Sequence, residues 1–210
     1  MLPVSLPSFA LGAASWTLAE YCIHRFAGHG PHRKPGRGLG RLSPLEIARA
    51  FHTEHVAHHQ NPSYFAPSWK KALVAVAVVP VVGSVAALAV GRRRGLSFAL
   101  GFASAYVGYE VMHRRIHVRP PRGRYLRWVY RNHLFHHLSP KVDHGVTVPF
   151  WDTLLGTSVA PPQVVRLHPR LVPPWLLDPE TGAVRAEHAA DYAVGPASGA
   201  RARPPAERPS

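Results

Sequence analysis

Residues 72–90 read ALVAVAVVPVVGSVAALAV, a run of 19 residues without a charged side chain. A helix of that length rises about 28 Å, and the hydrocarbon core of a bilayer is about 30 Å thick. A pair of buried strands is the alternative for so many Val and Ala residues, but the run is too long for one strand. The segment therefore predicts a membrane-spanning helix, kinked by Pro80 and Gly83.

Two further apolar segments flank this run. Residues 2–23 contain one charged side chain, Glu20, and residues 95–112 contain one, Glu110. The first segment differs from a signal peptide, because no Lys or Arg precedes it and basic residues follow it. We therefore expect an all-α integral membrane protein with three candidate spans, 2–23, 72–90 and 95–112. A short interfacial helix is the alternative for the first.

The chain is strongly basic, with 25 Lys and Arg residues against 11 Asp and Glu residues and a formal net charge of +14. Eight basic residues lie between the first and second candidate spans, eight lie between the third span and Thr157, and three form the run at 92–94. The positive-inside rule places the two larger groups on the cytoplasmic side. The run at 92–94 contradicts this topology, so a hairpin of the second and third segments that does not fully cross is the alternative.

The charge alone would also fit a nucleic-acid partner. We expect no nucleic acid, because the sequence has no recognition motif and such a partner leaves the apolar segments unexplained. A single cysteine excludes a disulfide framework and cysteine-based zinc or iron–sulfur sites. Residues 161–210 hold ten of the 22 prolines. We therefore expect a membrane domain over 1–160 and a Pro-rich, largely disordered tail over 161–210, in which residues 169–177 can pack as an extended strip and the disorder begins at about Asp178.

Histidine is the most unusual component of this chain, and ten of the 15 histidines fall into four short motifs. The motifs are HRFAGH at 24–29, HVAHH at 55–59, HRRIH at 113–117 and HLFHH at 133–137. Residues i, i+3 and i+4 share one face of a helix, so the three imidazoles of each HxxHH motif should point the same way. His24 and His29 are five residues apart and converge only if the helix ends between them, for which Gly28 is suitably placed.

Ten imidazoles are too many for a structural zinc site, which needs four ligands. Ten ring nitrogens divide into two sites of about five, each with room for an exogenous ligand. Neutral imidazole binds iron, zinc, copper and nickel, and the all-nitrogen set fits a redox metal pair that activates dioxygen, with the metal left open. The ten candidate ligands are His24, His29, His55, His58, His59, His113, His117, His133, His136 and His137.

Other polar residues lie among or beside these motifs. His52 and His144 are possible further ligands or hydrogen-bonding partners of ligands. Six acids and amides are candidates for orienting the imidazoles, and the alternative is an ion pair with a nearby arginine, such as Glu110 with Arg114. These six are Glu20, Glu54, Glu110, Asn132, Asp143 and Asp152. The histidines that we interpret as surface residues without a role are His32, His168 and His188.

The four motifs, in this order, resemble those of the fatty acid hydroxylase/sterol desaturase superfamily of membrane-bound di-iron oxygenases. The resemblance runs from about Trp16 to Thr157 and includes EYCIHRF at 20–26 and HGVTVPFWDTLLGT at 144–157. It implies a mostly helical membrane protein with a histidine-rich helical cap on the cytosolic side. It also implies O2-dependent hydroxylation or desaturation of an unactivated C–H bond of a lipid, in lipid biosynthesis.

The resemblance further implies that the ten histidines hold two iron ions, with zinc able to occupy the sites in purified protein. We expect two departures from the family: members commonly have four spanning helices, whereas three or fewer are expected here, and we expect no cytochrome b5-like haem domain. Electrons should therefore come from a separate ferredoxin- or cytochrome b5-like donor, which the basic surface can dock.

The substrate class stays open among fatty acyl, ceramide-like, sterol and carotenoid lipids, and the context of His24 slightly favours the fatty acyl branch. A desaturase or a carotenoid hydroxylase using the same site is the enzymatic alternative. The other alternative is a membrane metal-binding protein without enzymatic activity. A metal carrier should have ionisable groups within its spans, and here the acids of the spans are Glu20 and Glu110, both near span ends.

Overall fold

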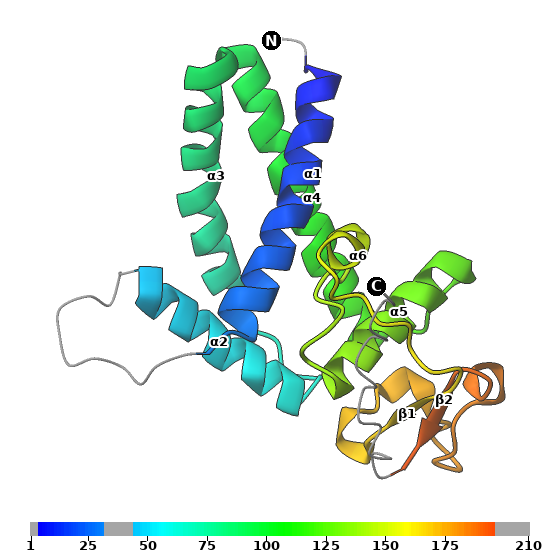
Figure 1. Ribbon diagram of the computed structural model, residues 1–210. Helices are drawn as coiled ribbons and strands as arrows, with labels where there is room; N and C mark the ends of the chain where they lie inside the picture. Colours follow the sequence, from blue (N-terminus) through cyan, green and yellow to red (C-terminus); the bar gives the residue numbers. More distant parts are fainter. Residues whose placement is uncertain (1–3, 32–43, 196–210) are drawn as a thin grey trace, which may run out of the picture.

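The computed structural model describes residues 4–31 and 44–195, and the chain is mostly helical, as expected (Figure 1). Its helical body consists of α1 (Leu6–Cys22), the π-helix η1 (Ile23–Gly28), α2 (Pro44–Gln60), α3 (Ser68–Val90), α4 (Arg92–Val118), α5 (Gly123–Leu138) and α6 (Phe150–Leu154). A small C-terminal unit follows, with strands β1 (Val165–Leu167) and β2 (Tyr192–Val194) and the 3-10 turns η2 (Pro169–Leu171), η3 (Pro174–Leu176) and η4 (Ala186–His188).

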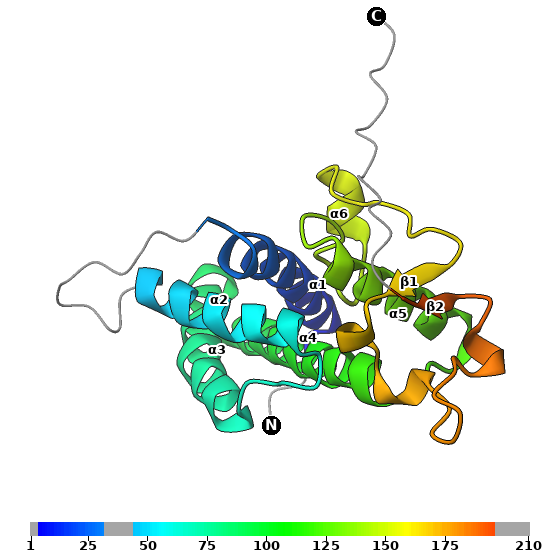
Figure 2. The ribbon, with the colours of Figure 1, turned by 90° about the horizontal axis from the view of Figure 1, so that it is seen from below.

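The three long helices α1, α3 and α4 run side by side, and α1 packs very closely on α4 (Figure 1). A Cβ atom on Gly12 would lie 2.0 Å from the carbonyl oxygen of Phe98, and one on Gly101 would lie 1.9 Å from that of Phe9. Only glycine permits this approach of two helix backbones, which is a common way of packing helices in membranes. The turn between α3 and α4 lies at one end of this bundle, and α2 crosses the other end (Figure 2).

Helix α3 is apolar and almost wholly unburied. Only 6% of its most apolar stretch of 18 residues is buried. A helix that is apolar on all sides favours lipid over water when protein does not cover it. Among the described residues, α3 is the one helix long and apolar enough to cross a membrane by length and composition. It contains the candidate span 72–90. The candidate spans 2–23 and 95–112 fall largely on α1 and α4 and stay predictions.

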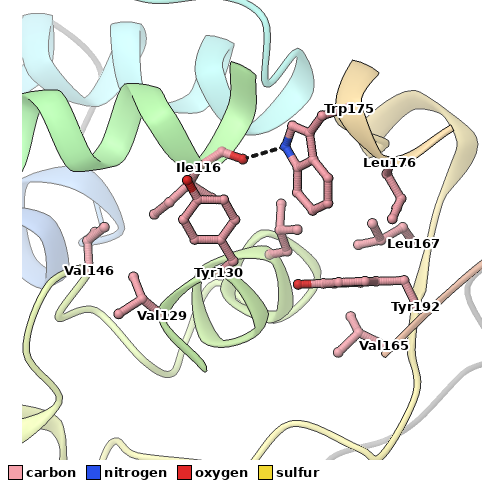
Figure 3. Packing of buried hydrophobic residues seen from close by; sticks show 10 residues of the cluster. Ile116, Val129, Tyr130, Val146, Val165, Leu167, Trp175, Leu176 and Tyr192 are labelled. Carbon is pink, nitrogen blue, oxygen red and sulfur yellow. Dashed lines mark hydrogen bonds between the residues drawn. The ribbon is translucent and has the colours of Figure 1, made fainter. Parts of the chain in front are cut away.

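Residues 165–194 are folded, which includes the strip at 169–177 that was expected to pack. The prediction of a largely disordered tail over 161–210 was wrong for the rest of this stretch. The strands β1 and β2 pair in parallel, with Val165 opposite Tyr192. Side chains of both strands belong to the same buried hydrophobic cluster as Val129 and Tyr130 of α5 (Figure 3). The three-residue strand β1 alternates buried, exposed and buried side chains, a signal too short to recognise within a Pro-rich stretch. Residues 196–210 lie outside the described part.

Trp175 fastens the C-terminal unit to the helical body, because its Nε1 donates a hydrogen bond of 2.8 Å to the carbonyl oxygen of Ile116 (Figure 3). The ring of His188 packs edge-on against Trp175 at 5.0 Å. His188 is buried, so our interpretation of it as a surface residue was wrong. His168 accepts a hydrogen bond from a backbone N–H of η2, and His32 lies outside the described residues.

Candidate metal centre

Four helical elements bring ten histidines together where η1, α2, α4 and α5 meet, below the long helices in Figure 1. Within each of two groups, one ring nitrogen of every residue lies within 4.8 Å of the others. The first histidine group comprises His24, His29, His55, His59 and His136. The second histidine group comprises His58, His113, His117, His133 and His137. These are the ten residues that the motifs singled out as candidate ligands.

Each HxxHH motif contributes to both groups. Successive residues of an α-helix are about 100° apart, so i and i+4 point about 40° apart, whereas i+3 and i+4 point about 100° apart. The i, i+4 pair of each motif accordingly joins one group and the i+3 residue joins the other. The prediction that all three imidazoles point the same way was therefore too coarse. The pairs are His55 with His59 and His133 with His137, and the single residues are His58 and His136.

His24 and His29 meet because α1 continues as the π-helix η1. The backbone N–H of His29 donates to the carbonyl oxygen of His24 at 3.1 Å, and this i→i+5 bond brings residues five apart onto one side. The helix ends at Gly28 as expected, but its widening before that point was not predicted. A Cβ atom on Gly28 would lie 3.0 Å from Cδ2 of His55, so the glycine makes room for a neighbouring imidazole.

Ring nitrogens in both groups are spaced like neighbouring ligands of one metal ion. In the first group, Nε2 of His29 lies 3.0 Å from Nε2 of His136 and 2.8 Å from Nε2 of His55. In the second group, Nε2 of His133 lies 2.9 Å and 3.1 Å from two neighbouring Nε2 atoms. Imidazole nitrogens bind zinc at about 2.0–2.1 Å, and two such bonds at a right angle place their nitrogens about 3 Å apart.

Backbone carbonyl groups orient three of the imidazoles. Nδ1 of His24 donates to the carbonyl oxygen of His144 at 2.5 Å, and Nδ1 of His58 donates to that of Tyr64 at 2.8 Å. Nδ1 of His136 donates to a third carbonyl, at 2.6 Å. Because a carbonyl only accepts, Nδ1 carries the proton in each neutral ring and Nε2 keeps its lone pair for the group interior. These partners could not be predicted from the sequence, because every residue has a backbone carbonyl group.

The burial of other ring nitrogens fits metal binding. The Nε2 atoms of His24, His58, His59 and His113 are buried, and none has a hydrogen-bond partner within residues 4–31 and 44–195. A buried nitrogen without a partner is costly, and most buried polar atoms in proteins have one. Coordination to a metal ion would use these lone pairs. The donor set therefore fits two metal ions bound through imidazole nitrogen.

Burial also keeps these imidazoles in the form that binds metal. It lowers the pKa of His29 and His58 to about 4 and the pKa of His59 to about 2. The same cause lowers the pKa of the other seven imidazoles below the usual range. A histidine must be neutral to ligate a metal ion, so all ten are ready to bind at neutral pH.

Asp152 organises the loop that supplies the carbonyl partner of His24. Its carboxylate is buried and accepts hydrogen bonds from the backbone N–H groups of His144 and Gly145, at 2.8 Å and 2.6 Å. It also accepts from the Thr157 hydroxyl at 2.7 Å. The carboxylate thus holds the His144 peptide in place, and Asp152 orients a histidine indirectly, through the backbone.

Glu20 joins the same loop to α1. Its carboxylate is buried and accepts from the backbone N–H of Val146 at 2.8 Å and from the hydroxyl of Thr147 at 3.1 Å. The hydroxyl of the next residue, Tyr21, is hydrogen-bonded to the Thr157 hydroxyl at 3.0 Å. Glu20 was a candidate for orienting an imidazole. It holds in place the loop whose His144 carbonyl oxygen orients His24.

Two of the expected orienting acids are engaged in ion pairs with the start of α3. Glu54 of α2 pairs with Lys70 at 2.6 Å, and Glu110 of α4 pairs with Lys71. Glu110 does not pair with Arg114, which was the example expected from sequence spacing. Both pairs tie the base of α3 to helices that carry histidines.

The remaining candidates lie beside the groups. Nδ1 of His52 donates to the carbonyl oxygen of Gly28 at 2.7 Å, and the His144 ring lies 5.7 Å from the ring of His24. Neither joins the five nitrogens of a group. Asp143 accepts from a backbone N–H of the following loop at 3.0 Å, and Asn132 donates to a carbonyl of its own helix at 3.0 Å.

Comparison with known proteins agrees with this arrangement. Residues 9–157 match the sequence model of the family described as fatty acid hydroxylase. The chain belongs to the fatty acid hydroxylase family. The matched region contains all ten histidines of the two groups, and the resemblance carried by the four motifs is confirmed.

Relatives of this chain include the ceramide very long chain fatty acid hydroxylase scs7 of Schizosaccharomyces pombe. It is 29% identical over 161 residues, which cover 74% of this chain and 43% of that protein. Fatty acid 2-hydroxylase of Rattus norvegicus is 31% identical over 160 residues, covering 72% of this chain and 39% of that protein. The chain thus spans about two fifths of the length of these two relatives. A solved structure of full-length scs7p, in which only the hydroxylase domain is visible, matches with a TM-score of 0.57 and 27% identity over 73% of this chain and 56% of that one.

Proposed function

We propose that this chain hydroxylates an unactivated C–H bond of a fatty acyl lipid, using dioxygen, two iron ions and external electrons. The observation that carries the proposal is the pair of groups of five imidazoles in a member of the fatty acid hydroxylase family. Four ligands suffice for a structural zinc site, so ten nitrogens in two adjacent groups favour a pair of reactive metal ions.

The ten histidines would hold the two ions, and bound iron would supply the activation of dioxygen and the removal of a hydrogen atom from the substrate. The protein supplies neutral ligands, a dry surrounding and fixed ring orientations. His59 of the first group and His137 of the second stack at 4.2 Å, which supports two sites close enough to act on one substrate. Iron rather than another metal is part of the proposal.

A membrane location with the histidine groups at the cytoplasmic face follows from the same reasoning. Helix α3 is uncovered and apolar, and the positive-inside rule places the two groups of eight basic residues, which flank the histidine motifs in sequence, on the cytoplasmic side. The basic run at 92–94 lies at the opposite end of α3 and α4 (Figure 1) and counts against this orientation. In this placement an acyl chain reaches the site from the bilayer. A separate ferredoxin- or cytochrome b5-like donor brings electrons from the cytosol to the basic surface.

The names of the relatives support the substrate class. They are called fatty acid 2-hydroxylase in Rattus norvegicus and dihydroceramide fatty acyl 2-hydroxylase FAH2 in Arabidopsis thaliana. Both names favour a fatty acyl substrate, and both favour hydroxylation over desaturation. A decisive experiment compares lipid extracts of cells with and without the chain by mass spectrometry. A product heavier by one oxygen atom supports the proposal, and one lighter by two hydrogen atoms shows a desaturase instead.

Metal analysis of the purified chain tests the site separately from the substrate. We expect close to two metal ions per chain, and His58→Ala and His136→Ala should each remove metal and activity together. His168→Ala is the matched control, because His168 lies in the C-terminal unit and belongs to neither histidine group. A well-folded chain with no metal, or full activity in His136→Ala, would show that the groups do not form the reactive site.

A further inference from the structure

A half-open cavity of about 560 Å3 lies between α5, the loop at 143–161 and the C-terminal unit. This volume falls within the range of small-molecule sites, which is about 300–1,000 Å3. Part of its wall, residues 158–161 and Asp191, lies beyond residues 9–157 that match the family. The folded C-terminal unit therefore completes a cavity that the matched region alone would leave open.

The cavity carries positive charge that the protein itself does not neutralise. Arg124 and Arg127 line it from α5, and both are exposed. Within the described part of the chain, neither forms an ion pair with an acid. By contrast, the neighbouring Arg131 pairs with Asp191 at 3.0 Å. Two guanidinium groups one turn apart on α5 are thus left for an anion from outside.

The acids in the same cavity are already engaged. Asp152 is buried beneath hydrogen bonds from two backbone N–H groups and a hydroxyl, and Asp143 is buried and accepts from a backbone N–H. Asp152 therefore belongs to the buried wall, where local donors stabilise its charge, whereas burial raises the pKa of Asp143 to about 7. An anion at the exposed arginines would meet the positive side of the cavity.

Apolar and aromatic side chains lie in and beside the cavity. Trp128 lines it and is partly exposed, and α6, which contributes Asp152 to the wall, exposes Phe150 and Leu154. Aromatic rings gather at the membrane–water interface, and basic residues beside them bind anionic headgroups. The cavity thus opens next to a surface that suits the interface better than water.

We propose that this cavity binds the phosphate group of an anionic lipid headgroup. Arg124 and Arg127 hold the phosphate oxygens, because guanidinium groups match phosphate in charge and geometry. The apolar part of the lipid lies along Trp128 and the exposed face of α6. The site is separate from the histidine groups, so it stands whether or not the chain hydroxylates a lipid.

Native mass spectrometry of the full chain in neutral detergent micelles tests this site by counting bound ligand. The probes are a short-chain phosphatidylglycerol, a phosphatidylcholine with the same acyl chains, and inorganic phosphate. We expect phosphatidylglycerol to saturate near one per chain and to bind about 30-fold more weakly to the double variant R124Q/R127Q, which corresponds to about 1 kcal/mol for each arginine. The charge-matched control R166Q/R170Q changes two exposed arginines of the C-terminal unit and should bind like the original chain.

Three outcomes would overturn the proposal. Equal binding of phosphatidylcholine would show that the anionic charge is not recognised. Unchanged binding to R124Q/R127Q would show that the lipid lies elsewhere. Inorganic phosphate binding as tightly as phosphatidylglycerol would make this a site for a soluble phosphate and not for a lipid.

Discussion

Replacing Asp152 with Asn changes a single atom where the loop at 143–157 is fastened beside the first histidine group. The Asn oxygen can still accept from the His144 N–H and the Thr157 hydroxyl, but its amide nitrogen would face the N–H of Gly145, now 2.6 Å from the carboxylate. A hydrogen bond to a charged group contributes about 1.5–3 kcal/mol. Asp152→Asn should therefore lower the free energy of unfolding by about 2–3 kcal/mol.

The consequence for metal binding follows from the displaced His144 peptide. Its carbonyl oxygen accepts the 2.5 Å hydrogen bond from Nδ1 of His24, and loss of such a partner typically weakens metal binding about 10–100-fold. We expect this loss at the first histidine group only, because the His144 carbonyl orients no histidine of the second. Dialysis against increasing chelator, followed by metal analysis, should then release one ion earlier than the other.

Asp178→Asn is the matched control for this measurement. Asp178 also accepts from two backbone N–H groups and a threonine hydroxyl, contributed by Glu180 and Thr181, but it does so in the C-terminal unit. Its replacement should leave metal release unchanged. The reasoning fails if Asp152→Asn retains both ions as tightly as the original chain, or if both ions are lost together.

Three further outcomes can be checked. His136→Ala should weaken metal binding at the first group, and His137→Ala should weaken it at the second, since these neighbours in sequence belong to different groups. Loss of the same metal ion in both variants would contradict this division. Burial lowers the pKa of His29 from 6.5 to about 4, so this histidine is protonated in the unfolded chain at a higher pH than in the folded one. The free energy of unfolding of the metal-free protein should therefore fall as the pH drops from about 6.5 toward 4. A denaturant titration that shows no such fall refutes this. Trp175→Ala should cost about 3–5 kcal/mol by removing a buried ring and its hydrogen bond to Ile116; a change below about 1 kcal/mol in the same titration would mean that the C-terminal unit does not depend on this anchor.

Much of the candidate site could be predicted from the sequence, because imidazoles at fixed helical spacing carry both a chemistry and a geometry. His113 and His117, four residues apart on α4, fall in one group as their spacing requires. Helix α3 could also be predicted from the sequence, since few structures other than a long apolar helix fit an uncharged run of 19 residues. In both cases the signal is local and repeats along one element.

Features that depend on distant parts of the chain could not be predicted. The π-helix before Gly28 has no established sequence signature, and the Nδ1 partners of His24 and His58 are backbone carbonyls. The two strands of the C-terminal unit were not predicted, because each has only three residues and their side chains are buried against α5, which is distant in sequence. Composition described that stretch correctly as Pro-rich, but Pro also limits the unfolded chain and favours defined turns.

The division of each HxxHH motif explains why this centre uses two of them. One such motif gives two imidazoles to one site and one to the other. Helix α2 contributes two imidazoles to the first group and one to the second, and α5 contributes one to the first and two to the second. His24 of η1 and His29, which follows this π-helix, complete the first group, and the pair from α4 completes the second, which gives five nitrogens to each. Because α2 and α5 each contribute to both groups, a shift of either helix would disturb both sites together. The division of each motif between the two sites therefore follows from the angle between successive residues on a helix.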